Sequence, residues 1–269
     1  MGKIRLDILL HQKGLAPSRE KARAMILAGE VTINGVRYDK PGTAVDETKV
    51  IEIKSCIPPY VSRGGLKLEK AIQVFKVDFR DMIVWDVGAS TGGYTDCALK
   101  HGALKVYALD VGYGQLDWSL RNNIQVVNIE KTNIRYFDPQ QLGELVDIVT
   151  IDVAFISTSK VFPVIKEGLK DDGFVISLIK PQFEAGRDNV GKKGVVKDKA
   201  IHQQVLSNCV QSANRSGLYC KNLTYSPIKG PQGNIEYFLL LNKHEANLDD
   251  LDSAIGQIVE EAHIQLGVN

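Results

Sequence analysis

The sequence contains few cysteines, and none of them stands at a spacing that binds metal. Its four cysteines are Cys56, Cys97, Cys209 and Cys220, which form no Cys-x-x-Cys pair and have no histidine near them at the spacing of a zinc site. This scatter argues against a zinc module and against a disulfide framework, and it favours free thiols in a reducing compartment. We therefore expect no metal in this protein.

Long apolar runs are also missing. No window approaches the roughly 18 consecutive apolar residues of a membrane-spanning helix. Lys3, Arg5 and Asp7 interrupt the stretch in which a signal peptide would need an apolar core. The sequence therefore predicts a soluble, cytoplasmic protein without a membrane partner.

The third absence concerns phosphate-binding fingerprints, because the chain has no G-x-G-x-x-G turn and no Gly-Lys-Ser/Thr. It has instead an apolar strand within residues 84–93 that ends in a Gly-rich turn, followed by a helix expected at 94–101. Gly88, Gly92 and Gly93 have no Cβ, so a ligand can approach the turn and the helix amides closely. This pattern favours a nucleotide-like ligand with little negative charge, and the sulfonium S-adenosylmethionine is the leading candidate. A plain α/β turn is the alternative.

Charge is distributed unevenly, although the formal net charge is only +1. Residues 1–70 contain 13 Lys and Arg against 8 Asp and Glu, whereas the rest contains 20 against 24. A basic head suggests binding to a polyanion. Ordinary fluctuation of composition is the competing interpretation.

The head shows a helical pattern that ends near Gly14 and a second helix expected at 19–28, with Ser18 as its N-cap. Asn34-Gly35 between alternating apolar residues predicts a β-hairpin, and a further strand is expected at 49–53. This α+β segment resembles the S4-type (αL) RNA-binding domain. The motifs that carry the resemblance are Arg5-Leu6-Asp7, Gly14-Leu15, Ser18-Arg19, Ala22, Ile26, Gly29, Val31, Asn34-Gly35 and Lys40-Pro41-Gly42.

The S4 resemblance implies that basic side chains of the two helices meet structured RNA. At the matching positions stand Arg5, Arg19, Lys21 and Arg23, which would contact phosphates and so supply affinity rather than base identity. The alternative is that these four side chains form a solvated helical face.

The body begins after Ile57-Pro58-Pro59-Tyr60, where consecutive prolines predict a short extended linker. We expect a head at 1–56, a linker at 57–61 and a body at 62–269. Apolar runs alternate with helical stretches through the body, which predicts an α/β fold with a mostly parallel sheet and helices on both faces. The expected strands are 83–87, 105–109, 124–128, 146–151, 173–178 and 237–242.

Polar residues stand at the ends of several of these strands, where open α/β sheets bind ligands. They are Asp110, Asp152, Lys180 and Glu236. Asp110 is suited to bind a ribose diol. A surface salt bridge is the alternative for each one alone.

The body resembles an FtsJ-type, Rossmann-like class I methyltransferase, and its pairing with the basic head resembles the TlyA family, whose members are named hemolysin A or ribosomal RNA 2′-O-methyltransferase. The carrying motifs are Ser62-Arg63-Gly64-Gly65-Leu66-Lys67-Leu68, Asp86-Val87-Gly88-Ala89-Ser90-Thr91-Gly92-Gly93, Asp152-Val153-Ala154-Phe155-Ile156-Ser157, Ile179-Lys180-Pro181-Gln182-Phe183-Glu184 and Gly233-Asn234-Ile235-Glu236. One departure from the family pattern is Ala154, where a serine is expected.

The resemblance implies a catalytic tetrad of Lys67, Asp152, Lys180 and Glu236, with S-adenosylmethionine as cofactor and ribosomal RNA or a ribosomal subunit as partner. Lys180 would act as the base towards a cytidine 2′-hydroxyl, Lys67 would hold the phosphate or oxyanion, and the two acids would orient the lysines. Arg63 joins the implied RNA-binding residues. The implied cofactor-binding residues are Asp86, Gly88, Ala89, Ser90, Thr91, Gly92, Gly93 and Asp110.

Two other functions stay open at this point, namely a pore-forming hemolysin and a non-catalytic RNA-binding or ribosome-assembly factor. Two segments also stay open. The basic loop 184–199 is either a cover for RNA or a mobile solvated loop. The segment 248–266 has an apolar helical face that we expect to pack on the body.

Overall fold

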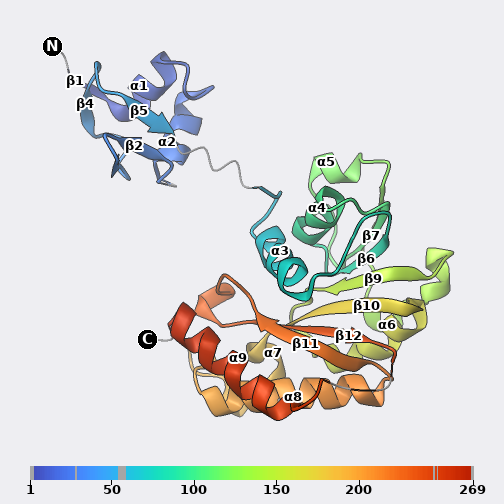
Figure 1. Ribbon diagram of the computed structural model, residues 1–269. Helices are drawn as coiled ribbons and strands as arrows, with labels where there is room; N and C mark the ends of the chain where they lie inside the picture. The colour runs from blue at the N-terminus through green and yellow to red at the C-terminus, as the bar shows by residue number, and fades with distance from the viewer. Residues whose placement is uncertain (1–2, 28, 54–58, 245, 247, 268–269) are drawn as a thin grey trace. The chain divides into compact units, whose positions relative to one another are not determined.

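The computed structural model describes residues 3–27, 29–53, 59–244, 246 and 248–267, and the chain divides into two compact units, Met1–Pro59 and Tyr60–Asn269 (Figure 1). The expected linker 57–61 lies partly outside the described residues. Tyr60, at its end, is buried in the second unit. Among the described residues, no helix combines the length and apolar character needed to cross a membrane.

The first unit is a small α+β module. Helices α1 (Leu6–Gln12) and α2 (Arg19–Leu27) pack on each other, and β2 (Val31–Ile33) pairs with β3 (Val36–Arg37) and β5 (Ile51–Ile53). The Asn-Gly hairpin is present, with φ of 53° and 77° at its two turn residues. The Ser18 hydroxyl accepts a hydrogen bond from the Lys21 amide at 3.2 Å, as expected of an N-cap.

Two short strands of the first unit were not expected. They are β1 (Lys3–Arg5) and β4 (Ala44–Asp46), which pair with each other and with no other strand in the described part of the unit. Three-residue strands give too few alternating positions for a sequence pattern to reveal them.

The second unit is built on a seven-stranded sheet in the order β11-β12-β10-β9-β6-β7-β8 (Figure 1). The five strands from β10 to β8 are parallel, and β12 runs antiparallel to both of its neighbours. This confirms the mostly parallel α/β fold. The strands are β6 (Ile83–Val87), β7 (Lys105–Leu109), β8 (Val126–Ile129), β9 (Val146–Ile151), β10 (Leu169–Ile179), β11 (Tyr219–Tyr225) and β12 (Tyr237–Asn242).

Helices cover both faces of this sheet, because successive strand residues point to opposite sides and both sides are apolar. Helices α3 (Gly64–Phe75) and α4 (Gly93–Lys100) pack on one face. Helices α6 (Phe162–Gly168), α8 (Lys199–Arg215) and α9 (Leu251–Leu266) pack on the other (Figure 1). The apolar side of α9 is buried against the body, which confirms the expectation for segment 248–266.

Short helical segments occupy the connections. They are α5 (Trp118–Arg121), α7 (Pro181–Glu184), and the 3-10 turns η1 (Ile134–Tyr136), η2 (Pro139–Leu142), η3 (Thr158–Lys160), η4 (Arg187–Asn189) and η5 (Pro231–Gly233).

The sheet differs from expectation at three strands. Strand β8 begins two residues later and ends one residue later than the expected strand 124–128. Strand β10 begins four residues earlier than the expected strand 173–178, and its register against β9 shifts between Leu169 and Phe174. Strand β11 was missed altogether. Its register against β12 shifts between Cys220 and Asn222, and such an irregularity breaks the alternation that identifies a strand.

Asp86 is placed differently from the prediction that it contacts a cofactor. It lies in β6 and is fully buried, where its carboxylate accepts hydrogen bonds from the hydroxyls of Thr95 at 2.7 Å and Thr150 at 3.0 Å. It therefore ties β6 to β9 and to the start of α4 from behind the Gly-rich turn. Burial raises the pKa of Asp86 from 3.8 to about 7, against the opposing effect of the two hydroxyl donors.

This burial predicts how the stability of the second unit depends on pH. Because the folded-state pKa of Asp86 is raised, its contribution to the free energy of unfolding is full below 3.8 and is lost as pH rises through about 7. We expect the Tm of the wild type to fall between about pH 5 and about pH 8 more steeply than the Tm of Asp86→Asn. Thermal unfolding followed by circular dichroism measures both slopes. Asp171→Asn, whose side chain is 99% exposed, should keep the wild-type slope; equal slopes in all three proteins would contradict the assignment.

Candidate active site

The register of the central strands brings the expected tetrad together. Continuing the β10–β12 pairing by one residue beyond Ile179↔Tyr237 sets Lys180 opposite Glu236. Asp152 follows β9 directly, beside the end of β10. These three positions share one face of the sheet with Leu178 and Phe238, the face that α3 covers. Lys67 reaches the same place from α3, where it is mostly buried.

The four side chains form two ion pairs. Lys67 Nζ lies 2.6 Å from Glu236 Oε2, and Lys180 Nζ lies 2.5 Å from Asp152 Oδ1. Glu236 is fully buried, and the other three side chains keep between 11% and 19% of their surface exposed. Each lysine is thus paired with one acid, and the four side chains have little exposure to solvent.

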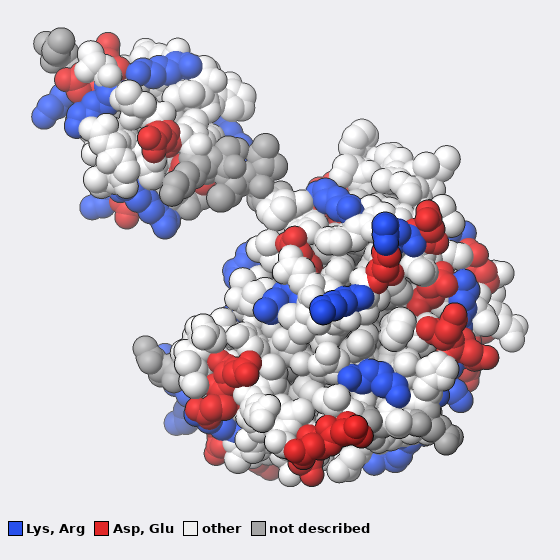
Figure 2. Space-filling model, viewed as in Figure 1, with Lys and Arg blue, Asp and Glu red and all other residues white. Residues whose placement is uncertain are grey.

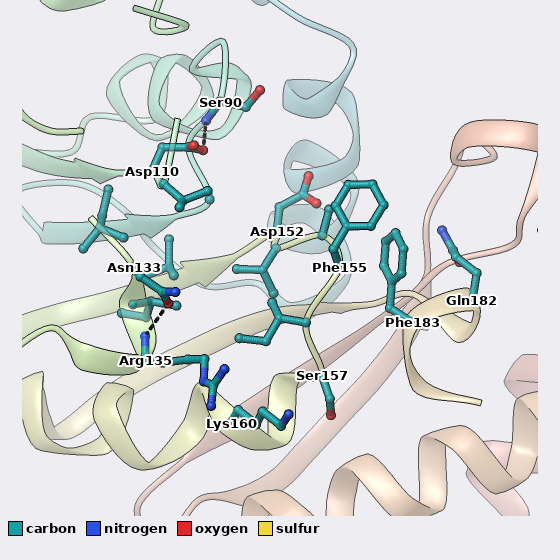
Figure 3. A pocket seen from close by; sticks show the side chains of 18 of the residues that line it. Ser90, Asp110, Asn133, Arg135, Asp152, Phe155, Ser157, Lys160, Gln182 and Phe183 are labelled. Atoms are coloured by element: carbon teal, nitrogen blue, oxygen red, sulfur yellow. Dashed lines mark hydrogen bonds between the residues drawn. The ribbon is translucent and has the colours of Figure 1, made fainter. Parts of the chain in front are cut away.

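Two cavities meet at this tetrad. The larger, of about 1010 Å³, lies over the carboxyl ends of β6, β7 and β9 (Figure 3), and the smaller, of about 550 Å³, contains Lys67 and Lys180. The residues that line both cavities are Gly88, Ser90, Asp152 and Ala154. A group bound in one cavity therefore faces the other across Asp152.

The Gly-rich turn forms the wall between them. Gly88 has φ of +90°, and a Cβ at this position would lie 2.4 Å from the Asp152 carbonyl oxygen, so only glycine fits. The Ser90 amide donates to Asp110 Oδ2 at 2.8 Å (Figure 3). The Gly112 amide donates to Asp110 Oδ1 at 2.6 Å. These two bonds fix the Asp110 carboxylate on the wall of the larger cavity.

Not every residue of the turn faces a cavity. Ala89 and Gly93 line the smaller one, and Gly88 and Ser90 line both. Thr91 and Gly92 line neither: the Thr91 carbonyl accepts from the Asp117 amide at 3.1 Å, and Gly92 begins α4 in a left-handed conformation. Like Asp86, these two residues support the turn from outside the cavities.

The sequence did not predict an aromatic pair at the larger cavity, formed by the exposed Phe155 and the half-buried Phe183. Phe155 is 91% exposed with φ of +61°, and its ring lies 5.0 Å from that of Phe183 (Figure 3). An apolar ring held in water at the mouth of a cavity, in a backbone conformation that bulky residues rarely adopt, is typical of a binding surface. The only signal in the sequence was its position shortly after Asp152.

Two buried polar atoms at the tetrad have no hydrogen-bond partner within the described chain. They are Glu236 Oε1 and the hydroxyl of Tyr94, a residue that lines the smaller cavity. Burial, and then the charges of Asp152 and Glu236, raise the pKa of Tyr94 well above its ordinary value, so the hydroxyl stays protonated. An unpaired buried polar atom is costly, which points to a partner supplied by a bound substrate.

The loop 184–199 is held at both ends. The Glu184 carboxylate accepts from the Ser157 hydroxyl at 2.7 Å and the Thr158 amide at 2.8 Å. At the other end the Asn234 side chain bonds the Val196 amide and the Gly194 carbonyl. His202 Nε2 lies 3.0 Å from the Val196 carbonyl. The loop is therefore tied to the body on both sides.

In the first unit, two of the expected RNA-binding residues share a buried acid. Arg5 binds both carboxylate oxygens of Asp7 at 3.0 Å, and Arg19 Nε binds Oδ2 at 3.1 Å. The Arg5 hydrogen bonds hold the pKa of Asp7 near 2 against its burial. Both arginine side chains are about half exposed, so they remain accessible to a ligand in solvent.

The other expected RNA contacts occupy accessible positions. Lys21 and Arg23 are exposed on α2, and basic side chains lie on the visible surface of the first unit (Figure 2). Arg63, which precedes α3, lines the smaller cavity beside the tetrad. In the described ranges, no group of three His, Cys, Asp or Glu side chains is arranged to hold a metal ion.

The chain matches two protein families. The FtsJ-like methyltransferase family matches residues 60–243, and the S4 domain matches residues 4–51. Both families were expected from the sequence motifs, and both expectations are confirmed.

Relatives with the same two parts cover nearly the whole chain. Hemolysin A of Brachyspira hyodysenteriae is 45% identical over 87% of this chain and 98% of that protein. The 16S/23S rRNA (cytidine-2′-O)-methyltransferase TlyA of Mycobacterium tuberculosis is 41% identical over 88% of this chain and 89% of that protein. A solved structure from Streptococcus thermophilus is 43% identical, with a TM-score of 0.77, and covers 98% of this chain and 97% of its own. The chain therefore belongs to the FtsJ-like methyltransferases, and among them to the TlyA family that joins an S4 domain to this fold.

Proposed function

We propose that this protein transfers a methyl group from S-adenosylmethionine to the 2′-hydroxyl of a cytidine in ribosomal RNA. The observation that carries the proposal is the pair of cavities that meet at Asp152, with the Lys180–Asp152 and Lys67–Glu236 ion pairs on the side of the smaller one. Relatives named as hemolysin and as cytidine-2′-O-methyltransferase are 45% and 41% identical to this chain, and the tetrad favours catalysis over a purely RNA-binding role.

The larger cavity fits the cofactor. Its wall next to the Gly-rich turn carries Asp110, suited to a ribose diol, and the apolar side chains of Val111 and Ile134, suited to an adenine ring. Asp110 and Asp152 are the acidic residues among those that line this cavity, and they favour a cationic ligand. When bound there, S-adenosylmethionine supplies an electrophilic methyl group.

The smaller cavity fits the acceptor ribose. In this step Lys180 acts as the neutral amine, after its own proton has left to solvent: its Nζ accepts the proton that the 2′-hydroxyl loses, and Asp152, at 2.5 Å, stabilises the ammonium that results. Lys67 Nζ, held by Glu236, offers positive charge to the developing oxyanion. The unpaired Tyr94 hydroxyl supplies a further hydrogen bond to the substrate. Holding the 2′-oxygen in line with the methyl group supplies much of the rate acceleration.

Removing Lys180 should abolish methyl transfer. We expect Lys180→Ala to lower the rate of tritiated-methyl transfer to 16S or 23S ribosomal RNA by about 1000-fold or more, with the affinities for RNA and cofactor retained. Lys170→Ala is a matched control. Lys170 of β10 pairs with Asp147 of β9 at 2.6 Å, near the starts of the two strands whose other ends lead to Lys180 and Asp152. It should keep activity within about twofold. Equal inactivity of wild type and Lys180→Ala on every ribosomal substrate would refute the proposal.

Removing the Asp110 carboxylate should weaken cofactor binding. Loss of hydrogen bonds to a charged group costs about 1.5–3 kcal/mol, so Asp110→Ala should raise the Kd for S-adenosylmethionine about 10- to 100-fold in calorimetric titration. Asp171→Ala, far more exposed, should leave the Kd unchanged. A wild type that does not bind the cofactor would favour the non-catalytic assembly factor instead.

Removing the exposed ring of Phe155 should weaken binding of the RNA acceptor and leave binding of the cofactor unchanged. Stacking of a base on an aromatic side chain contributes about 1–3 kcal/mol, so we expect Phe155→Ala to raise the KM for RNA about 5- to 100-fold. The Kd for the cofactor should stay the same. Ile264→Ala, which removes another exposed apolar side chain from α9, serves as the control. An unchanged KM would mean that Phe155 does not meet the RNA.

A further inference from the structure

The wall of the larger cavity carries three cations. They are Arg135 on η1, Lys160 on η3 and Arg187 on η4, all exposed and all part of the cavity wall. Arg135 and Lys160 lie at the same end of the cavity, opposite Ser90 and Asp110 (Figure 3). Three separate connections of the sheet thus contribute positive charge to one cavity, two of them at its end away from Asp110 (Figure 3).

These charges are not neutralised by the protein. Across residues 3–267, apart from the few that the structure does not describe, none of the three lies within ion-pair distance of a carboxylate. Arg135 lies over the ring of Tyr136, 5.3 Å from its centroid. Glu184, close in sequence to Arg187, binds Ser157 and Thr158 rather than a cation. Uncompensated like charges on one cavity wall repel one another until an anion binds.

The cofactor does not match these charges. S-adenosylmethionine has a single carboxylate against a sulfonium and an ammonium, so it can neutralise at most one of the three cations, and its sulfonium is attracted by Asp110 and Asp152 instead. The cavity has room for a second group, because about 1010 Å³ stands at the upper limit of the roughly 300–1,000 Å³ usual for a small-molecule site. Its two ends therefore differ in charge and suit two different ligands.

We propose that Arg135, Lys160 and Arg187 form a binding site for a phosphodiester group of the RNA acceptor, next to the nucleotide that is methylated. The inference rests on the proposed function and extends its binding site. Guanidinium groups match phosphate oxygens in a bidentate manner, and lysine adds a compact charge. Phe155 and Lys160 belong to the same connection after β9, so a stacked base and a neighbouring phosphate would meet one continuous surface.

The test neutralises the three cations together, in the full chain, as Arg135→Gln, Lys160→Gln and Arg187→Gln. Fluorescence anisotropy gives the Kd for 16S and 23S ribosomal RNA transcripts at several salt concentrations, and calorimetry gives the Kd for S-adenosylmethionine. We expect the RNA Kd to rise about 10- to 100-fold near 0.1 M salt and the slope of log K against log salt to flatten by about 2. The cofactor Kd should change by no more than about twofold.

A matched control removes three other exposed cations that line neither cavity, as Lys76→Gln, Lys166→Gln and Arg215→Gln. It separates loss of this site from loss of net charge. RNA affinity that is equal in the two triple variants would overturn the inference. ADP provides a second test. If ADP stabilises the wild type but not the cavity variant, and both bind RNA equally well, the site binds a free nucleotide and the inference is overturned.

The outcome is independent of the proposed reaction. If the wild type methylates no ribosomal RNA, the proposed function fails, whereas the anisotropy comparison still reports on the phosphate site. If the wild type methylates RNA and the cavity variant binds RNA as the wild type does, only the phosphate site fails.

Discussion

Strand register is the constraint on which the candidate active site depends. Lys180 and Glu236 face each other because β10 and β12 pair antiparallel in a fixed register, and Asp152 joins them because β9 runs parallel to β10. A slip of one residue in β12 would turn Glu236 to the opposite face of the sheet and leave Lys67 without its acid. Such a slip would also exchange the side chains of β12 between the two buried layers, because Tyr237, Leu239 and Leu241 pack on one face and Phe238 and Leu240 on the other, so that neither layer would pack as it does. Core packing and catalysis therefore make the same demand on the sequence.

Much of this arrangement could be predicted from the sequence, because it depends on periodic patterns and on the direction of parallel strands. Apolar runs located five of the strands that carry or neighbour the site, and polar residues directly at their ends marked Asp110, Asp152 and Lys180. The family motifs added Lys67, which stands on a helix and has no strand end to reveal it. The S4 domain could be predicted equally well, because the Asn34-Gly35 turn and the Ser18 N-cap are local signals in the sequence.

The rest depends on tertiary packing that no local pattern contains. Asp86 has the residue type and position of a ligand contact, yet Thr95 and Thr150 enclose it, and only the folded sheet brings Thr150 there. Phe155 belongs to an unremarkable apolar stretch until its backbone turns the ring outward. The cations of the larger cavity come from three connections that are far apart in the sequence, and the folded sheet brings them to the wall of one cavity. Strand β11 was hidden by its irregular register.

The attachment of loop 184–199 at both ends affects how water could be excluded from the active site. Side-chain hydrogen bonds from Glu184 and Asn234 fasten both ends of the loop to the body, so these ends cannot move over the tetrad unless the bonds break. Methyl transfer benefits from excluding water, which otherwise solvates the nucleophile and weakens the electrostatic contacts. A substrate that stacks on Phe155 and reaches the cations beyond it would cover the larger cavity itself. The acceptor RNA would then act as the lid, and the transfer site would be complete only when the correct polymer lies on it.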